Sequence, residues 1–572
     1  MFRFKDITKK NHILKILLIV IGVLLFLSAC PQSPDSPLSE EDNYEIPLPV
    51  NGIGFVEPGN NNILYTGNIL LSDDGIYKGQ MLINQDGLII YIGRSAENMP
   101  EAVGATKIIC AYGLAVPGFI DSWRHTTYAG GSISSSSPDV TGERYDHRHE
   151  WRKGLNGHSQ ISYSNPNIPL WDEIGLIMTG TTTAIGTASE TAGSGGLVRQ
   201  LKSGSLSGGL INDDLSNEID TFPLGDITGE MSQLLGYDYA GDLPTWPQNA
   251  DNITYSLIIS EGINAEARNE FLTLSNTDLV ANTTNILTDT VNIVHGLGLK
   301  TEDYKLMVDA GSSLVWTPRS DLFLYGNTAM VTVFDTLGGN ITLGSTWSIS
   351  GSINTLLEIQ TAAFFNQTYL NNYFSDLDII NMATLNAAKA FKIDYKVGSL
   401  EVGKIADFTI FDTRDVSGFD AVLDADQSKI TLVFRAGTPL YGDTYLIDSI
   451  RPVTTGSETL LVNGCTKRIY TIEEIGKTIA QVEADASVTP IPLVYNASIL
   501  NTKIVPERTG WSAGGYEYTG QITSNDLDGD GIENNLDNAP NYFNPVRPLD
   551  DGVQADSDGD GVGDVIDPTP LL

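Results

Sequence analysis

The stretch NIVHGLGLKTEDYKLMVDAGSSLVWTPRS, residues 292–320, contains two short apolar segments separated by a segment with helical patterning. The first apolar segment, NIVHGLGL, precedes TEDYKLMVDAG, and the second lies in SSLVW. This order is typical of parallel β/α units, because a parallel connection must cross back over its sheet. The same alternation runs from about residue 165 to residue 396. We therefore expect an α/β fold, in its most economical form a (β/α)8 barrel.

Short strands are predicted on both sides of this α/β region. Residues 62–116 alternate apolar stretches with Gly, Asn and Asp turns, which is typical of antiparallel strands. Strand-like patterning returns over residues 398–445. The predicted order is a leader (1–30), a linker (31–50), the first part of a β domain (51–116), the barrel (117–396), the second part of the β domain (397–445), an appended segment with weak signals (446–520) and a tail (521–572).

The first 30 residues have the features of a targeting segment. Five basic residues precede an apolar run from Ile16 to Leu27, which is shorter than a typical membrane span. The run ends in Leu-Ser-Ala-Cys, which resembles the lipobox of bacterial lipoproteins. The resemblance implies a lipidated Cys30 in the bacterial cell envelope, and Pro31 after it favours the outer membrane or cell surface of a Gram-negative cell. An uncleaved N-terminal anchor is the alternative.

The net charge of −38 argues strongly against nucleic-acid binding. The acidic excess is uneven along the chain. From Gln521 to the C-terminus there are eleven Asp and one Glu against a single basic residue, Arg547. Local acidity of this kind predicts either cation binding or a solvated tail.

Two copies of one twelve-residue pattern favour cation binding in the tail. They are DLDGDGIENNLD (526–537) and DSDGDGVGDVID (556–567), with Asp at positions 1, 3, 5 and 12 and Gly at position 6. A calcium loop uses this spacing, because alternate carboxylates converge where the Gly permits a sharp turn. The predicted calcium ligands are Asp526, Asp528, Asp530, Asn534, Asp537, Asp556, Asp558, Asp560, Asp564 and Asp567.

The sequence around these loops distinguishes among calcium motifs. No helix-forming sequence flanks the loops, so paired EF-hands are not expected. The two copies resemble thrombospondin type 3 repeats, including the Pro540 and Pro568 that follow them. Asp in place of Glu at position 12 predicts modest affinity, suited to millimolar external calcium.

Two other patterns carry weaker signals. Cys110 and Cys465 could pair in an oxidising compartment, but two buried free thiols are the favoured reading, and nothing indicates a Cys-based metal site. The Gly-rich stretch at residues 186–201 lacks the Lys-Ser/Thr ending of a phosphate-binding loop. We expect it to be a barrel loop.

The body of the chain, about residues 62–445, resembles the amidohydrolase superfamily, in particular metal-dependent hydrolases of the imidazolonepropionase and chlorohydrolase type. The resemblance implies a metal-bearing (β/α)8 barrel with a small β-sandwich built from segments on both sides of it, and hydrolysis of carbon–nitrogen bonds. The blocks that carry it, in chain order, are PGFID (117–121), ERYDHRHEWRKG (143–154), SEGINAEARNEF (260–271), NIVHGLGL (292–299), VWTPRSDLFLYG (315–326), LGSTWSISGSINTLLE (343–358), ATLNAAKAFKI (383–393) and GSLEVGKIADFTIFD (398–412).

The family's metal ligands are only partly present. The family holds its metal with His-x-His on the first strand, a His on the fifth, often one on the sixth, and an Asp on the eighth that also accepts the proton of the metal-bound water. Here the first pair is Trp123 and His125, the fifth-strand position is Ile258, the sixth keeps His295, and the eighth is Thr346. Zinc normally needs three or four protein ligands. We therefore expect the inherited metal chemistry to be lost.

Other residues could rebuild a site or bind a ligand. Candidates for a residual or rebuilt divalent-metal site are His125, His147, His149 and His295, with Asp146 or Glu261 supplying charge. The resemblance gives the His147–His149 stretch a separate role, in substrate contact or loop packing. His295 and Glu261 could remain as substrate-binding groups, although buried, hydrogen-bonded polar residues are the favoured reading. Arg319 could clamp a substrate, with Tyr325 beside it, or pair with Asp321.

Three functions are therefore open. The first is a hydrolase of carbon–nitrogen bonds with an unusual site. The second, which the residues favour, is a protein without the metal chemistry that binds a small amide-like or peptide-like ligand. In the third, the calcium tail mediates adhesion and the barrel is a scaffold, since a fold can be inherited without its chemistry.

Overall fold

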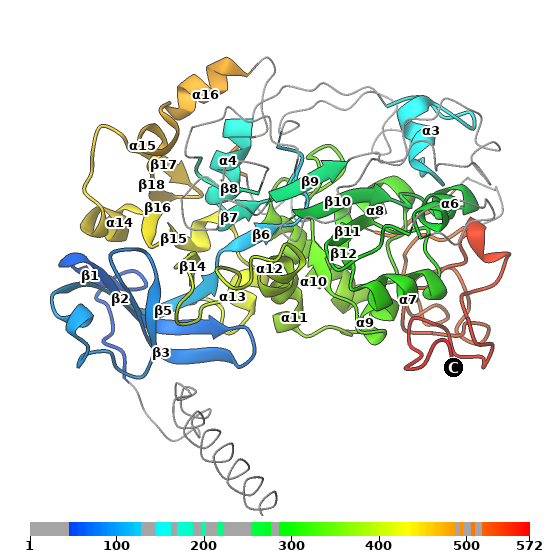
Figure 1. Cartoon of the computed structure of the whole chain (residues 1–572), viewed down its shortest axis with the longest axis horizontal. Helices are drawn as coiled ribbons and strands as arrows, with labels where there is room; N and C mark the ends of the chain where they lie inside the picture. Colours follow the sequence, from blue (N-terminus) through cyan, green and yellow to red (C-terminus); the bar gives the residue numbers. More distant parts are fainter. Residues whose placement is uncertain are drawn as a thin grey trace, which may run out of the picture.

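The computed structural model describes residues 45–126, 143–161, 169–186, 196–201, 216–220, 253–275, 285–486, 492–495, 505–509 and 517–572. The predicted leader with Cys30, most of the predicted linker and residues 187–195 of the Gly-rich stretch lie outside the described residues. None of the described helices is long and apolar enough to cross a membrane. Figure 1 shows long strands at one end, parallel strands and helices in the middle, and the C-terminal residues at the other end.

Eight short parallel strands form the middle of the molecule. They lie in two sheets, and each sheet follows the order of the chain. The first sheet contains β6 (Phe119–Asp121), β7 (Thr181–Ala184) and β8 (Arg199–Gln200), and the second contains β9 (Ser216–Asp220), β10 (Ile253–Ile259), β11 (Val291–His295), β12 (Ser313–Trp316) and β13 (Ile341–Leu343).

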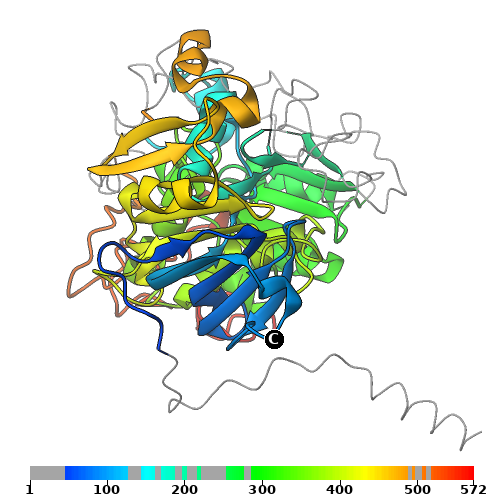
Figure 2. The same cartoon turned by 90° about the vertical axis from the view of Figure 1, so that its left-hand side faces the viewer.

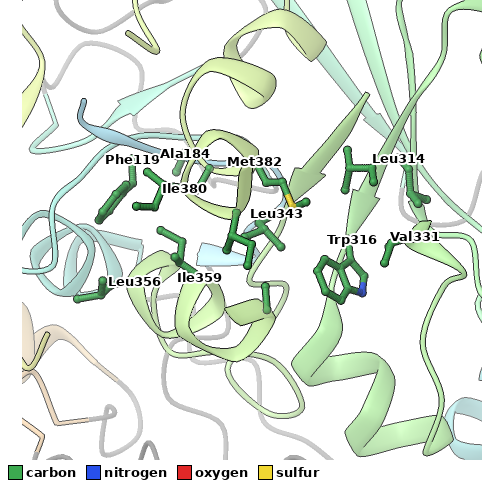
Figure 3. Close-up of a cluster of buried hydrophobic side chains, with 14 of the residues drawn as sticks. Phe119, Ala184, Leu314, Trp316, Val331, Leu343, Leu356, Ile359, Ile380 and Met382 are labelled. Atoms are coloured by element: carbon green, nitrogen blue, oxygen red, sulfur yellow. The ribbon is translucent and has the colours of Figure 1, made fainter. Parts of the chain in front are cut away.

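Helices cover these strands. Every residue of β11, β12 and β13 is buried, as expected for parallel strands with both faces covered. Figure 3 shows the apolar side chains between strands and helices, with Leu314, Trp316 and Leu343 from the strands and Leu356 and Ile359 from a helix. The helices are α3 (Arg148–Lys153), α4 (Pro169–Ile177), α6 (Ala265–Leu274), α7 (Thr301–Ala310), α8 (Pro318–Tyr325), α9 (Val331–Thr336), α10 (Thr355–Tyr369), α11 (Asp376–Met382) and α12 (Leu385–Ala390).

The two parallel sheets are joined on one side, beyond the ends of β6 and β13. The Ser122 amide donates to the Leu343 carbonyl at 3.0 Å, and the Thr346 amide donates to the Trp123 carbonyl at 2.7 Å. The other side, between β8 and β9, has no strand pairing among the described residues. The α/β fold with eight parallel strands in chain order is present, but the described residues do not form the closed (β/α)8 barrel that we expected. We call this region the barrel.

The strands expected as a small β-sandwich are hydrogen-bonded into one ten-stranded sheet, which faces the viewer in Figure 2. It combines segments from both sides of the barrel, because β14 pairs with β5. Two of its strands, β17 and β18, lie beyond residue 445, so the sheet extends into the segment expected to be appended. The strands are β1 (Phe55–Glu57), β2 (Asn60–Leu71), β3 (Gly75–Ile83), β4 (Ile89–Gly93), β5 (Ala105–Pro117), β14 (Phe408–Asp412), β15 (Ile430–Arg435), β16 (Thr438–Asp443), β17 (Glu458–Val462) and β18 (Cys465–Ile469).

The sheet has its own apolar core and connects to short helices. Tyr65, Phe408 and Phe434 are buried in this core, where the last two rings stack. Cys110 and Cys465 are free thiols, and burial raises the pKa of Cys110 to about 12. The remaining helices of the described chain are α13 (Asp420–Leu423), α14 (Thr444–Ile450), α15 (Thr471–Ile475), α16 (Ile479–Asp485) and the 3-10 turns η1 (Pro100–Ala102), η4 (Gln427–Lys429) and η6 (Pro548–Asp550).

Candidate functional site

The five positions that correspond to the family's metal ligands lie at the carboxyl ends of the parallel strands, which we call the barrel mouth. Trp123 and His125 follow β6, Ile258 lies in β10, His295 ends β11, and Thr346 follows β13. Because carboxyl ends of parallel strands share one edge, the strands place these side chains on the same face of the barrel. Their assignment as former metal positions stays a prediction.

Two of the substituted positions belong to one hydrophobic cluster. Trp123 and Ile258 pack with Val294 and Val315, and all four side chains are buried. Gly344 lies directly against this cluster, since a Cβ there would lie 2.8 Å from the Trp123 Cβ and 2.8 Å from Val315 Cγ1. Residues at two expected metal positions thus fill space with apolar side chains.

His125 does not offer its Nε2 lone pair to a metal. Trp123 Nε1 donates a hydrogen bond to His125 Nε2 at 3.1 Å, and the rings meet edge to face. Burial, together with the charges of His295 and Arg124, lowers the pKa of His125 to about 3. The imidazole is therefore neutral near pH 7, with its proton on Nδ1.

Thr346 is held in a backbone conformation that β-branched residues rarely adopt. Its φ is +55°, and its amide donates to Trp123 while its carbonyl accepts from the His125 amide at 3.0 Å. The Thr346 hydroxyl is buried and has no hydrogen-bond partner among the described residues. A left-handed conformation favours Gly, Asn or Asp, so threonine stores strain at this point.

His295 is held between two carboxylates. Its Nδ1 donates to Asp321 Oδ1 at 2.8 Å, and its Nε2 lies 3.9 Å from Glu261 Oε1. Burial alone would lower the pKa of His295, but the charge of Glu261 and the hydrogen bond to Asp321 outweigh it and raise the pKa. An imidazolium has no lone pair for a metal. The mouth therefore stabilises a charged His295.

Hydroxyl groups complete this network. Thr317 Oγ1 and Thr328 Oγ1 donate to the two oxygens of Asp321, at 2.8 and 3.0 Å. Tyr325 OH donates to Glu261 Oε1 at 2.8 Å and accepts from Trp151 Nε1 at 2.9 Å. Asp321 was expected only as a possible partner of Arg319. Its i, i+4 spacing from Thr317 was a signal for the pairing that the sequence reasoning missed.

The backbone amide of Arg319 contacts the carboxylate of Glu358. The Arg319 amide donates to Glu358 Oε1 at 3.2 Å, and the Arg319 charge lowers the pKa of that carboxyl. Burial is the larger effect and raises the pKa of Glu358 to about 7. The Asp321 carboxylate accepts from His295, Thr317 and Thr328.

His147 and His149 pack together against a buried ion pair. His147 Nδ1 accepts from the His149 amide at 3.1 Å at the start of α3, and the two rings are 4.8 Å apart. Arg148 Nη1 donates to Glu270 Oε2 at 2.6 Å, and His147 Nε2 lies 3.5 Å from the other oxygen. Burial would raise the pKa of Glu270, but Arg148 lowers it to about 2. Glu270 lies in the block at residues 260–271, but the sequence reasoning gave it no role.

The candidate ligands do not fit a metal in the barrel mouth. Within the described parts of the chain, three or more ligand atoms of the His, Cys, Asp or Glu type come within 4.8 Å of one another only in the two C-terminal loops. The four histidines proposed for a rebuilt site do not form such a group. His125 Nε2 accepts from Trp123 Nε1, and His295 Nδ1 is hydrogen-bonded to Asp321, so the two retained ligands cannot supply the three or four protein ligands that zinc normally needs. We derive no step through a metal here.

The two C-terminal loops have the same internal hydrogen bonds. In the first loop, the Gly529 and Gly531 amides donate to the two oxygens of Asp526, at 2.7 and 3.1 Å. In the second loop, the Gly559 and Gly561 amides donate to Asp556 at 2.8 and 3.0 Å. The glycines at position 6 have φ of +89° and +93°, which is the turn that the pattern predicted.

The first loop is the more buried of the two. Asp528 and Asp530 are 1% and 0% exposed, and Asp528 Oδ2 has no hydrogen-bond partner among the described residues. Burial, followed by the charge of Asp530, raises the pKa of Asp528 to about 8. Crowded carboxylates of this kind are stabilised by a cation. Asp537 and Asp567, at position 12, each also have one oxygen without such a partner.

Comparison with known proteins identifies part of the chain. Residues 277–440 match the sequence model of the amidohydrolase family. A 5-methylthioadenosine/S-adenosylhomocysteine deaminase of Teredinibacter turnerae is 31% identical over 134 residues, which are 23% of this chain and 30% of that protein. A guanine deaminase of Rattus norvegicus is 26% identical over 137 residues, 23% of this chain and 30% of that protein. The chain thus spans about a third of the length of these relatives.

Solved structures give a more distant likeness. A zinc-bound adenosine deaminase from Xanthomonas campestris is 14% identical, with a TM-score of 0.47 over 70% of this chain and 96% of that one. A guanine deaminase from Bradyrhizobium japonicum is 15% identical, with a TM-score of 0.47 over 67% and 99%. The segment that matches the amidohydrolase family model runs from before β11 into β16 and includes His295 and Asp321.

Proposed function

We propose that this chain is a lipid-anchored envelope protein of the amidohydrolase superfamily. By lineage it is a hydrolase of carbon–nitrogen bonds. Its barrel binds a small amide-like ligand and does not carry out metal-dependent hydrolysis. The tail binds calcium. One observation supports the proposal for the barrel. Trp123 packs on Ile258 and donates a hydrogen bond to His125 Nε2, so three of the expected metal positions contact one another instead of a metal.

Metal analysis of the intact chain tests this proposal. We expect far less than one zinc, iron or manganese per chain, with or without the metal in the growth medium. One tightly bound ion per chain would overturn the proposal. A stricter test combines Trp123→His, Ile258→His and Thr346→Asp. The triple variant should gain metal, because it restores two neutral nitrogens and one carboxylate.

Hydrolysis without a metal is the second candidate function. The observation in its favour is the buried chain of Glu261, His295 and Asp321, in which a charged imidazole lies beside a carboxylate. Such a pair can hold and move a proton. Adenosine, guanine and 5-methylthioadenosine are suitable first substrates, chosen from the names of the similar proteins. Turnover that survives chelation and is lost in Glu261→Gln would establish this function in place of ligand binding alone.

The calcium proposal rests on the two loops. Each brings three Asp carboxylates together within 4.8 Å, and a buried oxygen of Asp528 has no protein partner among the described residues. Titration calorimetry with calcium should give about two sites, and Asp528→Ala combined with Asp558→Ala should abolish them. No heat at millimolar calcium would contradict the assignment.

The anchor proposal rests on the sequence LSAC alone. A Cys30→Ser variant should lose incorporation of a labelled fatty acid and leave the membrane fraction, as the loss of a lipid anchor requires. Adhesion through the tail remains the alternative output. It predicts calcium-dependent attachment of cells that is independent of the barrel residues.

A further inference from the structure

The C-terminal residues, which include the two calcium loops, pack against one side of the barrel. In Figure 1 the C-terminal segment lies beside α7 and α9. Phe543 packs its ring on Phe365 and Tyr369 of α10, and its amide donates to the Tyr369 carbonyl at 2.9 Å. Such contacts with buried aromatic residues are typical of a domain core, so the tail is part of the folded body.

Two buried arginines connect this tail region to the barrel mouth. Arg547 Nη1 donates to the carbonyls of Leu297 and Leu299, at 2.9 and 2.8 Å, in the loop that directly follows His295. Its remaining nitrogens pair with Asp550 at 2.9 Å. These bonds satisfy carbonyls of the mouth loop that would otherwise need water or another donor.

The second arginine, Arg508, reaches the opposite edge of the same site. Its Nη2 donates to Asp146 at 2.6 Å, and its Nη1 lies 3.2 Å from the Tyr145 carbonyl and 3.4 Å from the Tyr325 carbonyl. Tyr325 is the residue whose hydroxyl donates to Glu261. Arg508 therefore holds the backbone of a residue that contacts the carboxylate of the mouth.

Each calcium loop also contacts the barrel, directly or through one neighbour. In the second loop, Asp564 at position 9 accepts from Thr301 Oγ1, in the first turn of α7. In the first loop, Gly529 and Gly531 pack on residues 517–520, where Tyr518 OH donates to the Gly326 carbonyl at 3.1 Å. Gln554, two residues before the second loop, contacts the first loop, since its Nε2 donates to Asp530 and Asp537 at 3.1 and 2.8 Å.

We propose that residues 505–509 and 517–572 form a calcium-dependent clamp on the barrel. In this clamp Arg508, which pairs with Tyr518 through the backbone, and Arg547 are positioning residues that make the order of the mouth depend on calcium. The inference rests on the proposed calcium binding. A cation that gathers the carboxylates of each loop fixes the segments that carry these arginines. When the loops open, the carbonyls of Leu297, Leu299 and Tyr325 lose their donors.

Hydrogen–deuterium exchange of the intact chain tests the clamp. Amides 297–304 and 322–327 should exchange about tenfold more slowly with calcium than with a chelator, while residues 63–83 of the distant sheet should not change. Calorimetry on the same sample separates the two proposals. Absence of calcium binding would defeat the proposed function. Binding without a change in exchange at the mouth would overturn the clamp.

Matched variants locate the coupling. Asp558→Asn in the second loop should remove protection at 301–304, whereas Asp528→Asn, at the equivalent position of the first loop, should remove it at 322–327. Arg547→Met should keep both calcium sites and lose calcium-dependent protection at 297–300, with partial rescue in Arg547→Lys. Protection that persists in a folded Arg547→Met chain would show that this arginine does not couple the two regions. If that variant does not fold, the loop variants decide the proposal.

Discussion

In the barrel mouth His295 lies between Asp321 and Glu261, whereas in the first C-terminal loop Asp526, Asp528 and Asp530 come together within 4.8 Å. The mouth balances its charges with its own side chains and hydroxyls. The loop gathers like charges, and a buried oxygen of Asp528 has no partner among the described residues. Convergence of polar groups therefore does not by itself indicate a metal. A metal site is indicated by a set of ligand atoms whose lone pairs do not already accept hydrogen bonds.

The largest effect should come from removing the apolar group that replaces a metal ligand. Trp123→Ala should destabilise the fold by about 3–5 kcal/mol, because it leaves a cavity in the cluster with Ile258, Val294 and Val315. Chemical denaturation monitored by far-UV circular dichroism measures the loss. A metal-site interpretation of the mouth predicts a small loss instead.

Two controls sharpen that result. Trp123→Phe keeps an aromatic ring but loses the Nε1 donor to His125, so it should cost less than the alanine variant. Val103→Ala removes methyl groups at a side chain that is 72% exposed and should change the stability by less than about 0.5 kcal/mol. Equal costs for Trp123→Ala and Val103→Ala would contradict a packed mouth.

Removing calcium should have the next largest effect. Calcium at about one hundred times its dissociation constant should add about 2.7 kcal/mol per site, since it binds the folded loops and not the unfolded chain. The midpoint of thermal unfolding should fall when a chelator is added. Asp528→Asn should reduce this difference, while Asp86→Asn, at an exposed turn in the distant sheet, should leave it unchanged. If a chelator does not change the midpoint of thermal unfolding of the wild-type chain, then the loops do not differ from the mouth in binding a cation.

Acid should destabilise the barrel through its neutral histidines. Burial lowers the pKa of His125 and of His149 to about 3, while an unfolded histidine titrates near 6.5. Between these values the unfolded chain binds more protons, so stability is present above about pH 6.5 and is lost as the pH falls. Each group should contribute a slope of about 1.4 kcal/mol per pH unit.

The variants His125→Gln and His149→Gln test this slope. A glutamine oxygen can still accept from Trp123 Nε1, so His125→Gln keeps the contact while removing the titration. Urea unfolding at pH 7, 6 and 5 should show a shallower pH dependence in each variant. An unchanged dependence would mean that neither histidine is buried in its neutral form.

Much of the fold could be predicted from local patterns. Alternation over residues 292–320 predicted β11, α7 and β12 in the order found, because strand and helix periods differ. The extension of the sheet to β17 and β18 was missed. Those strands are short, and only pairing with β16 makes them part of the sheet.

The site was harder to predict than the fold. Spacing and resemblance placed Trp123, His125 and His295 at strand ends, where they lie in the structure. The partners Asp321 and Glu270 lie in α8 and α6, and Glu261 lies in the loop after β10, so no short-range spacing pairs them with His295 or Arg148. The docking of Arg508 and Arg547 also depends on contacts across more than 180 and 240 residues, which a single sequence does not encode in its spacing.

The smallest expected effect is a gain in stability at Thr346. This threonine has a φ of +55° and a buried hydroxyl without a partner among the described residues, so it combines backbone strain with an unsatisfied polar group. Thr346→Asn relieves the strain and should stabilise the fold by about 0.5–1 kcal/mol, since Asn tolerates the left-handed region. Thr361→Asn is a matched control, because Thr361 lies within helix α10 and its hydroxyl donates to the Leu357 carbonyl at 2.7 Å, so this change should destabilise. If both variants lose stability in urea unfolding, then the packing of the Thr346 side chain outweighs its backbone strain. The mouth would then be packed around Thr346 as it is around Trp123.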